Sequence, residues 1–188
     1  MLVSQRSHGR SRGRLITFGV RERKDVKSWV EFIERTYNPE KIILAGISMG
    51  ASTVLMASKL ILSNKVKGII ADCGYTCPAD IIKETIKALH LPVYPTFWFI
   101  NFYSILFAGI NLKKHSTINA IKNTQIPILF IHGTSDGFVP CRMSVENFEA
   151  KKENAKLLLI DGAYHAGAYV KDPSLYEKTV REFLGEGN

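Results

Sequence analysis

The chain has 188 residues, of which 46% are hydrophobic and 22% are charged, and this is typical of one ordinary soluble globular domain, 1–188. Its three cysteines are an odd number without a CxxC pair, which argues against a disulfide framework or a metal cluster and favours reduced thiols in a cytoplasmic protein. The net charge of +8 is concentrated in residues 1–27, where no aromatic residues alternate with the arginines, so a solvated surface is favoured over a transit peptide or a nucleic-acid-binding arm.

Five short apolar runs predict β-strands. They are β-branched or rich in leucine and apolar throughout, as parallel strands covered on both faces should be. In chain order, the expected strands are Met1–Ser4, Lys41–Ala45, Gly68–Ala71, Ile128–Ile131 and Lys156–Ile160.

Amphipathic segments between these runs predict helices. Apolar side chains recur on one stripe in residues 26–37, and further helices are expected from Ser48 to about Ser63, near Met143–Asn154 and near Pro173–Leu184. Strands that alternate with helices form βαβ units with right-handed crossovers. The sequence therefore predicts the α/β fold class, with a mostly parallel sheet of about five strands flanked by helices.

A stretch of roughly 55 residues separates the third and fourth expected strands, and such an insertion is usually functional. Within it, Ala88–Leu112 has no Asp, Glu, Lys or Arg and is long enough to cross a bilayer. Two prolines, Pro92 and Pro95, and polar residues such as Asn101 interrupt it. We therefore interpret it as a buried or substrate-facing lid and expect no stable membrane span.

The segment "GISMG", residues 46–50, matches G-x-S-x-G between an expected strand and an expected helix. A tight turn there needs glycine on both sides of Ser48, because a Cβ would collide, and it raises the serine to the carboxyl end of the sheet. The N–H of Met49 then points toward Ser48 from a helix N-terminus, where it stabilises an oxyanion. Ser48 is the candidate nucleophile; a passive capping serine is the alternative.

A serine hydroxyl needs a base, and five histidines are present. His165 follows the last expected strand in a loop rich in Gly and Ala, so it is the favoured base. His132 ends a strand and is interpreted as structural. The others lie in an early loop, in the lid and at the end of the lid: His8, His90 and His115.

The base needs a carboxylate to fix its tautomer. Asp136 lies just past the fourth expected strand and is favoured, while Asp72 at the end of the third strand and Asp161 remain alternatives. The order Ser48, Asp136, His165 is the nucleophile–acid–base order of α/β-hydrolases.

Several motifs in one order make a resemblance specific. The chain resembles α/β-hydrolases of the bacterial serine-esterase and peptidase-like group, in which an "RGHGxSxG" loop, a "GxSMGA" elbow, a "HGxxDxxVP" acid turn and a late histidine loop follow one another. The corresponding segments here are "QRSHGRSRG" (5–13), "GISMGAS" (46–52), "ADCGYT" (71–76), "IHGTSDGFVP" (131–140) and "GAYHAGAY" (162–169).

This resemblance implies that residues 78–116 form a cap over an acyl pocket. The cap aromatics Phe97, Trp98 and Phe102 would then contact the substrate, together with Phe99, Tyr103 and Phe107. Ordinary core packing is an equally open interpretation of these rings.

The resemblance also implies that three strands, one helix and a second oxyanion loop precede the "RGHG" loop in relatives, so this chain is expected to be N-terminally truncated. Loss of one oxyanion donor costs about 3 to 4 kcal/mol of transition-state stabilisation. We therefore expect weak turnover, and self-association through an exposed sheet edge.

Together these observations predict a serine hydrolase that cleaves carboxylic esters or related small acyl compounds with Ser48, Asp136 and His165. No metal, cofactor or nucleic-acid partner is expected. The alternative is a catalytically impaired remnant, or a binding domain, that keeps the fold.

Overall fold

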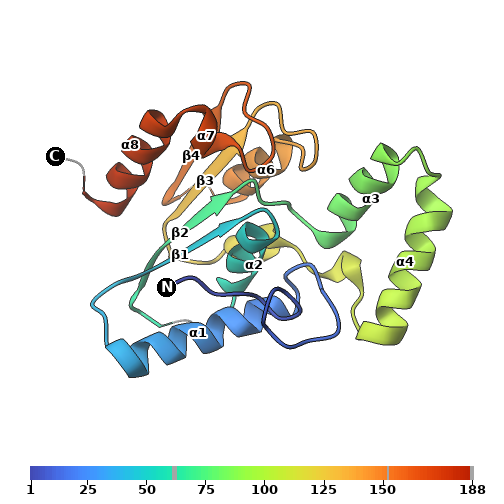
Figure 1. Ribbon diagram of the computed structural model, residues 1–188, viewed down its shortest axis with the longest axis horizontal. Helices are drawn as coiled ribbons and strands as arrows, with labels where there is room; N and C mark the ends of the chain where they lie inside the picture. The colour runs from blue at the N-terminus through green and yellow to red at the C-terminus, as the bar shows by residue number, and fades with distance from the viewer. Residues whose placement is uncertain (61–62, 152, 187–188) are drawn as a thin grey trace.

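The computed structural model describes residues 1–60, 63–151 and 153–186. Its centre is a parallel sheet in which the strands follow one another in the order β1-β2-β3-β4 (Figure 1). The strands are β1 (Ile42–Ile47), β2 (Val66–Asp72), β3 (Ile128–Gly133) and β4 (Ala155–Ile160). Because all four run the same way, their carboxyl ends meet at one edge of the sheet. The expected α/β fold class is confirmed, with four strands in place of about five.

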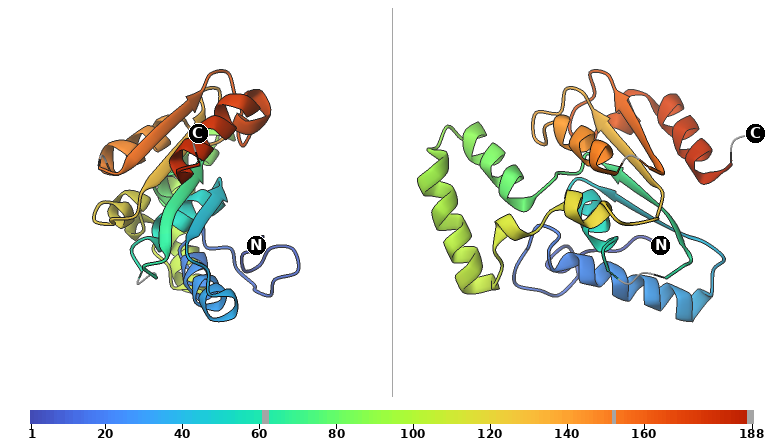
Figure 2. Two further views of the ribbon diagram at one scale, coloured as in Figure 1. Left: turned by 90° about the vertical axis from the view of Figure 1, so that its left-hand side faces the viewer. Right: turned by 180° about the vertical axis from the view of Figure 1, so that it is seen from behind.

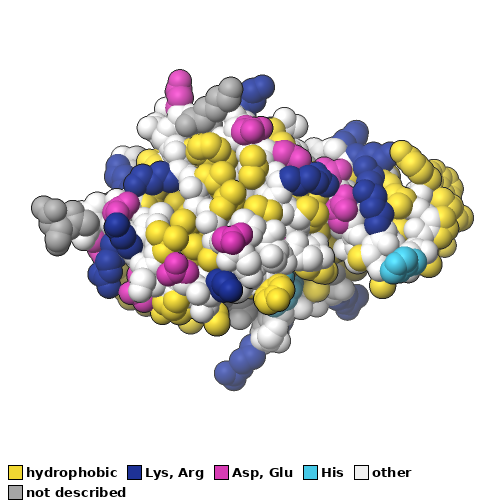
Figure 3. Space-filling view, turned by 90° about the horizontal axis from the view of Figure 1, so that it is seen from above, with side chains coloured by type: hydrophobic (Ala, Val, Ile, Leu, Met, Phe, Trp, Pro, Cys, Tyr) yellow, Lys and Arg dark blue, Asp and Glu magenta, His cyan; other side chains and the backbone are white. Residues whose placement is uncertain are grey.

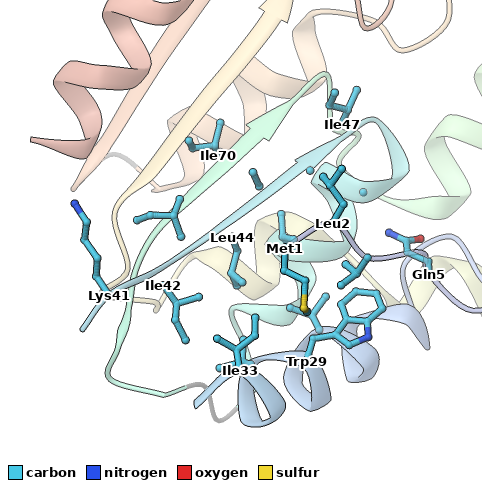
Figure 4. A pocket seen from close by; sticks show the side chains of 18 of the residues that line it. Met1, Leu2, Gln5, Trp29, Ile33, Lys41, Ile42, Leu44, Ile47 and Ile70 are labelled. Atoms are coloured by element: carbon cyan, nitrogen blue, oxygen red, sulfur yellow. The ribbon is translucent and has the colours of Figure 1, made fainter. Parts of the chain in front are cut away.

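The expected strand at Met1–Ser4 is wrong. These residues are irregular, and the side chains of Met1 and Leu2 are 70% and 103% exposed. Four residues with a single neighbouring strand gain few ladder hydrogen bonds against the entropy lost on ordering. Met1, Leu2 and Val3 instead line an open groove along β1, where Met1 lies over Trp29 and Ile33 (Figure 4).

Helices pack on both faces of the sheet (Figure 1, Figure 2). Residues that alternate along the strands divide between the faces: Ile69 and Phe130 belong to one apolar core, and Ile70 and Leu129 to the other. The first core is shared with α1 (Glu22–Tyr37), α2 (Met49–Ala57), α5 (Thr117–Ile121) and α6 (Arg142–Lys151). The second core is shared with α7 (Ala168–Lys171) and α8 (Pro173–Leu184).

The expected helices are found with changed ends. The helix expected from Ser48 to Ser63 is α2, which ends at Ala57, and residues 61–62 of that expectation lie outside the described part. The helix expected at Met143–Asn154 is α6, and residue 152 also lies outside. The expected bounds of α8 are confirmed. The helix begins there because Asp172 accepts a hydrogen bond from the Leu175 N–H, and it ends where Gly185 adopts φ 76°.

The insertion between β2 and β3 is helical. It contains α3 (Pro78–Ala88), α4 (Val93–Ala108), the short 3₁₀ helix η1 (Leu112–Lys114) and α5, and its α3 and α4 stand beside the sheet at one end of the molecule (Figure 1). Among the described residues, no single helix has the length and apolar character to cross a membrane. Only α4 joined to Leu112–Ile121, which is bent from it by 89°, meets those two criteria together.

The outer edge of β1 borders a groove of about 640 Å³. Figure 4 shows its mostly apolar lining, with Leu44 and Ile47 of β1 on one side and Trp29 and Ile33 of α1 on the other. Within the described residues, β1 pairs with β2 alone. This side of the sheet is therefore open, whereas β3 is paired on both sides.

Candidate active site

Ser48 lies at the turn between β1 and α2 with φ 55° and ψ −116°, a conformation that strains a residue with a side chain. A Cβ added at Gly46 would stand 2.3 Å from the carbonyl carbon of Gly50, so the turn requires glycine there. At Gly50 an added Cβ would meet nothing nearer than the Gln5 amide nitrogen at 3.8 Å. The expectation that glycine is needed on both sides of Ser48 is therefore wrong for position 50.

Backbone hydrogen bonds fix this turn to the neighbouring strands. The Ser48 N–H donates to the Asp72 carbonyl oxygen at 2.8 Å, and the Cys73 N–H donates to the Ile131 carbonyl oxygen at 2.8 Å. The carboxyl ends of β1, β2 and β3 are thus held side by side, and the Ser48 side chain stands at that edge.

The structure brings the three predicted site residues together. The Ser48 Oγ lies 3.0 Å from His165 Nε2, and His165 Nδ1 lies 2.7 Å from Asp136 Oδ2. The imidazole is partly exposed, with 26% of its side-chain surface accessible. Because a carboxylate only accepts, Nδ1 carries the proton and Nε2 is free to accept the proton of the Ser48 hydroxyl.

Asp136 is held as a charged acceptor. Its Oδ1 accepts the N–H groups of Phe138 and Val139, both at 2.9 Å. Burial by itself would raise the pKa of Asp136, but hydrogen bonds from His132, His165, Val139 and Phe138 outweigh it and lower the pKa to about 2. The carboxylate is therefore ionised at neutral pH and can stabilise an imidazolium at His165.

The fully buried His132 contacts the same oxygen of Asp136 as His165 does. Its Nε2 lies 3.1 Å from Asp136 Oδ2 and 3.0 Å from the Val139 carbonyl oxygen, and its Nδ1 lies 2.6 Å from Ser144 Oγ. Because the Val139 carbonyl can only accept, Nε2 of His132 is the donor. His132 therefore orients the carboxylate and has no contact of its own with Ser48.

Gly133 at the end of β3 lets the histidine loop approach closely. A Cβ there would lie 2.2 Å from the Ala163 carbonyl oxygen, and the same carbonyl accepts the Ser135 N–H at 3.1 Å. This contact joins the turn that carries Asp136 to the loop that carries His165. The glycine of "IHGTSD" thus sets the distance between acid and base.

Met49 is the first residue of α2, so its N–H belongs to the group that has no partner inside the helix. Its side chain packs against the buried cluster of Tyr75, Ile81, Val139 and Met143. This packing fixes the helix start beside Ser48, and the helix dipole there favours negative charge.

The rival residues lie elsewhere. Asp72 is buried and accepts the Tyr176 hydroxyl at 3.2 Å; burial raises its pKa despite this hydrogen bond. Asp161 is exposed and accepts the Thr134 hydroxyl at 2.9 Å. His8 lies in the early loop with Nδ1 at 2.9 Å from the Arg6 carbonyl oxygen, and His90 follows α3.

Cys73 is a neighbour of the site that the sequence did not single out. Its sulfur and ligand atoms of Asp136 and His165 lie within 4.8 Å of one another. Burial raises the pKa of the Cys73 thiol to about 12, and the nearby charge of Asp72 adds to the effect. Because metals bind the thiolate, this protonated thiol makes a poor metal ligand at neutral pH.

The aromatic residues of the expected cap lie on α4 and differ in burial. Phe97 is 4% exposed and packs against α3, whereas Trp98 and Phe102 are exposed and stack on each other with ring centroids 5.6 Å apart. Their role in substrate binding stays a prediction. The ring that contacts His165 is Phe138, at 5.0 Å between centroids. Its position two residues after Asp136 was the signal available in the sequence.

Comparisons with known proteins found similar sequences, although no family model matches the chain. The uncharacterized proteins YqkD of Bacillus subtilis and YfhR of Escherichia coli are 29% and 22% identical over 100% and 97% of the chain. The chain spans 62% and 59% of their lengths.

Solved structures are also similar. The esterase Pf2001 of Pyrococcus furiosus superposes with a TM-score of 0.72 at 25% identity, covering 97% of this chain and 68% of the esterase. An α/β serine hydrolase homologue from Coxiella burnetii superposes with a TM-score of 0.61 at 20% identity, covering 95% of this chain and 65% of the homologue. The chain therefore has an α/β-hydrolase-like fold.

Proposed function

We propose that this α/β-hydrolase-like chain is a serine hydrolase that cleaves carboxylic esters or related small acyl compounds. The observation that carries the proposal is the continuous hydrogen-bonded path from the Ser48 hydroxyl through His165 to Asp136, with distances of 3.0 and 2.7 Å. The similar protein from Pyrococcus furiosus is an esterase, which supports the same reaction class for this chain.

Acylation follows from the proton positions. His165 Nε2 takes the Ser48 proton as Oγ attacks the acyl carbon, and the charge that forms on the carbonyl oxygen faces the Met49 N–H. Asp136 stabilises the imidazolium without taking its proton. The imidazolium then gives its proton to the departing alkoxide, which leaves an acyl group on Ser48 and free alcohol.

Deacylation repeats these steps with water. His165 removes a proton from the water molecule that attacks the acyl-serine, and it returns the proton to Ser48 Oγ as the carboxylic acid leaves. No external oxidant or co-reactant is needed. Phe138 meets the imidazole edge to face with ring centroids 5.0 Å apart, a contact expected to limit reorientation of the ring during both half-reactions.

Two measurements on the intact chain test this function. A fluorophosphonate probe is expected to label Ser48, and p-nitrophenyl acetate is expected to be hydrolysed, with both signals abolished in Ser48→Ala. The matched control is Ser52→Ala, since Ser52 is buried in the same helix and hydrogen-bonds with Tyr75. Absence of labelling in the folded wild-type chain, under conditions that label a known serine esterase, would reject the proposal.

A catalytically impaired remnant or binding domain is the second candidate, and the open groove along β1 favours it. That groove lies beside the elbow and includes Gly46, Ile47 and Gly50 in its lining. If the Met49 N–H is the one backbone donor that the described residues supply, turnover about 10² to 10³ below that of a two-donor esterase is expected. Probe labelling without measurable turnover would favour this candidate.

A further inference from the structure

Helix α4 exposes apolar side chains over most of its circumference. Phe97 and Ala108 are its buried residues, and it contains no charged residue. A helix that is apolar all round is buried in a protein or placed in lipid, because water solvates it poorly. The exposed apolar and aromatic side chains of α4 are Tyr94, Trp98, Phe99, Ile100, Phe102, Tyr103, Ile105, Leu106 and Phe107.

One narrow stripe of α4 faces the protein. Phe97, Asn101, Ser104 and Ala108 recur at steps of four, three and four residues, which places them on one side of the helix. Phe97 and Ala108 belong to the core shared with α3, and Asn101 Oδ1 accepts the Leu112 N–H at 2.9 Å. The remaining circumference, about two-thirds of the helix, is exposed and has no neighbour among the residues that the structure describes.

The exposed rings form a continuous ridge. Trp98 stacks on Phe102 with centroids 5.6 Å apart, and Tyr103 stacks on Phe107 at 6.0 Å, while Phe102 and Tyr103 meet edge to face. Trp and Tyr carry a polar atom on an apolar ring, which suits the boundary between lipid headgroups and acyl chains.

The surroundings of α4 are basic. Residues 85–135 contain four lysines and no Asp, Glu or Arg. Lys113 and Lys114, just after α4, are exposed and form no ion pair with any described residue. On α3, Lys83 and Lys87 are paired with acidic neighbours, Asp80 and Glu84. Figure 3 shows the apolar side chains gathered at this end of the molecule with dark blue Lys and Arg beside them.

We propose that α4 docks this protein onto the surface of anionic phospholipid membranes. Its 16 residues span about 24 Å, shorter than the roughly 30 Å hydrocarbon core, so the helix lies in the interface and does not cross it. The aromatic ridge enters the boundary between headgroups and acyl chains, while Lys113 and Lys114 meet the phosphate and carboxylate groups.

A lipid surface fits α4 better than a second copy of the chain does. A helix–helix contact covers one stripe, whereas the apolar side chains here occupy several directions around the axis. Fluid lipid can contact apolar side chains that point in several directions. The lysines also argue against a symmetric pairing of this region, because two copies would bring like charges together.

Co-sedimentation of the intact chain with vesicles tests the proposal. Binding to an equimolar mixture of phosphatidylserine and phosphatidylcholine is expected to exceed binding to phosphatidylcholine alone by at least about tenfold, and to weaken as salt is added. In a Trp29→Phe chain, the remaining Trp98 fluorescence is expected to shift to the blue on binding and to be quenched by brominated lipid. Because phospholipids carry carboxylic esters, the assay is also run with the Ser48→Ala chain, and equal binding by both chains makes the result independent of hydrolysis at Ser48.

Matched variants separate this surface from general stickiness. Phe102→Glu is expected to lower vesicle binding at least about tenfold, whereas Phe32→Glu, at a similarly exposed ring on α1, leaves it unchanged. The double variant Lys113→Glu with Lys114→Glu should also lower vesicle binding. The double variant Lys24→Glu with Lys178→Glu changes the net charge equally and should leave binding unchanged. Circular dichroism checks that each variant is folded.

Three outcomes would overturn the proposal. The first is equal binding to both vesicle types without salt dependence, and the second is equal loss in the test and control variants. The third is a lipid-free dimer that Phe102→Glu dissociates, with no binding to vesicles, which would assign α4 to a second copy instead. The proposal is supported if binding is stronger to anionic vesicles and is weakened by the α4 variants but not by the control variants.

Discussion

The two sides of Ser48 are built differently. Toward β3 and β4, Asp136 and His165 are held by a network in which the carboxylate has four hydrogen-bond partners. Toward β1, the neighbouring residues Gly46, Ile47 and Gly50 line an open groove of about 640 Å³, and the buried Gln5 Oε1 in that lining has no hydrogen-bond partner among the described residues. In the proposed reaction, proton transfer at Ser48 is thus supported by a closed network, while stabilisation of the oxyanion depends on the Met49 end of α2.

The largest expected effect comes from removing the Ser48 hydroxyl or the His165 imidazole from the hydrogen-bonded network. Ser48→Ala and His165→Ala should each lower the kcat/KM of ester hydrolysis by about 10⁴ or more, since the hydroxyl and the imidazole act as one unit. For the same reason the double variant should lose no more than either single one. Initial rates with p-nitrophenyl acetate measure this; additive losses in the double variant would contradict a shared role.

Loss of the Asp136 carboxylate is expected to give the next largest effect. Asp136→Asn should lower kcat by about 10⁴, because an amide can present its NH₂ group to His165 and favour the wrong tautomer. The matched controls are Asp72→Asn and Asp161→Asn, whose side chains bond to Tyr176 and Thr134 instead. A comparable loss in either control would contradict the assignment of Asp136 as the catalytic acid.

The parts that the sequence predicted are those fixed by local pattern. Apolar runs of four or five residues located β1 to β4, and the "GISMG" turn located the elbow, because both signals involve contiguous residues. The Asp136 and His165 positions followed from loops just after strands in a parallel sheet. Such loops meet at one edge whatever the details of packing.

The parts that it missed depend on neighbours distant in sequence. Met1–Ser4 has the composition of a strand, yet pairing is a property of two strands, and this segment has no ladder with β1. The tolerance of Gly50 could not be foreseen, because it depends on what lies around it in space. Likewise, the contact of Phe138 with His165 joins two loops whose approach is set by Gly133 and Ala163.

The elbow glycines offer a test of intermediate size. Gly46→Ala should destabilise the fold by about 3 kcal/mol, because the new methyl group would overlap the Gly50 backbone, which cannot move freely. Gly50→Ala should be close to neutral. The free energy of unfolding in urea measures both, and equal destabilisation would show that the turn is not limited by the Gly46 contact.

The pKa of Asp136 gives a smaller, pH-dependent effect. Burial acts to raise it, but the hydrogen bonds prevail and lower it from 3.8 to about 2. A lowered folded-state pKa adds stability that is complete above pH 3.8 and is lost as the pH falls toward 2. The loss should be on the order of 2 kcal/mol. Unfolding at pH 5 and near pH 2, with Asp136→Asn as the variant lacking this contribution, measures it.

The smallest expected effect concerns the open side. An exposed strand edge pairs with other strands, so the unpaired β1 edge is expected to support weak self-association of the chain. Ala45 is exposed on this strand, and Ala45→Lys should weaken association by roughly tenfold, because an edge lysine opposes strand pairing. Sedimentation equilibrium over a range of concentrations measures the change, and Lys178→Ala on α8 is the control. If Ala45→Lys leaves association unchanged, the contact lies elsewhere. Phe102→Glu then tests whether α4 provides that contact.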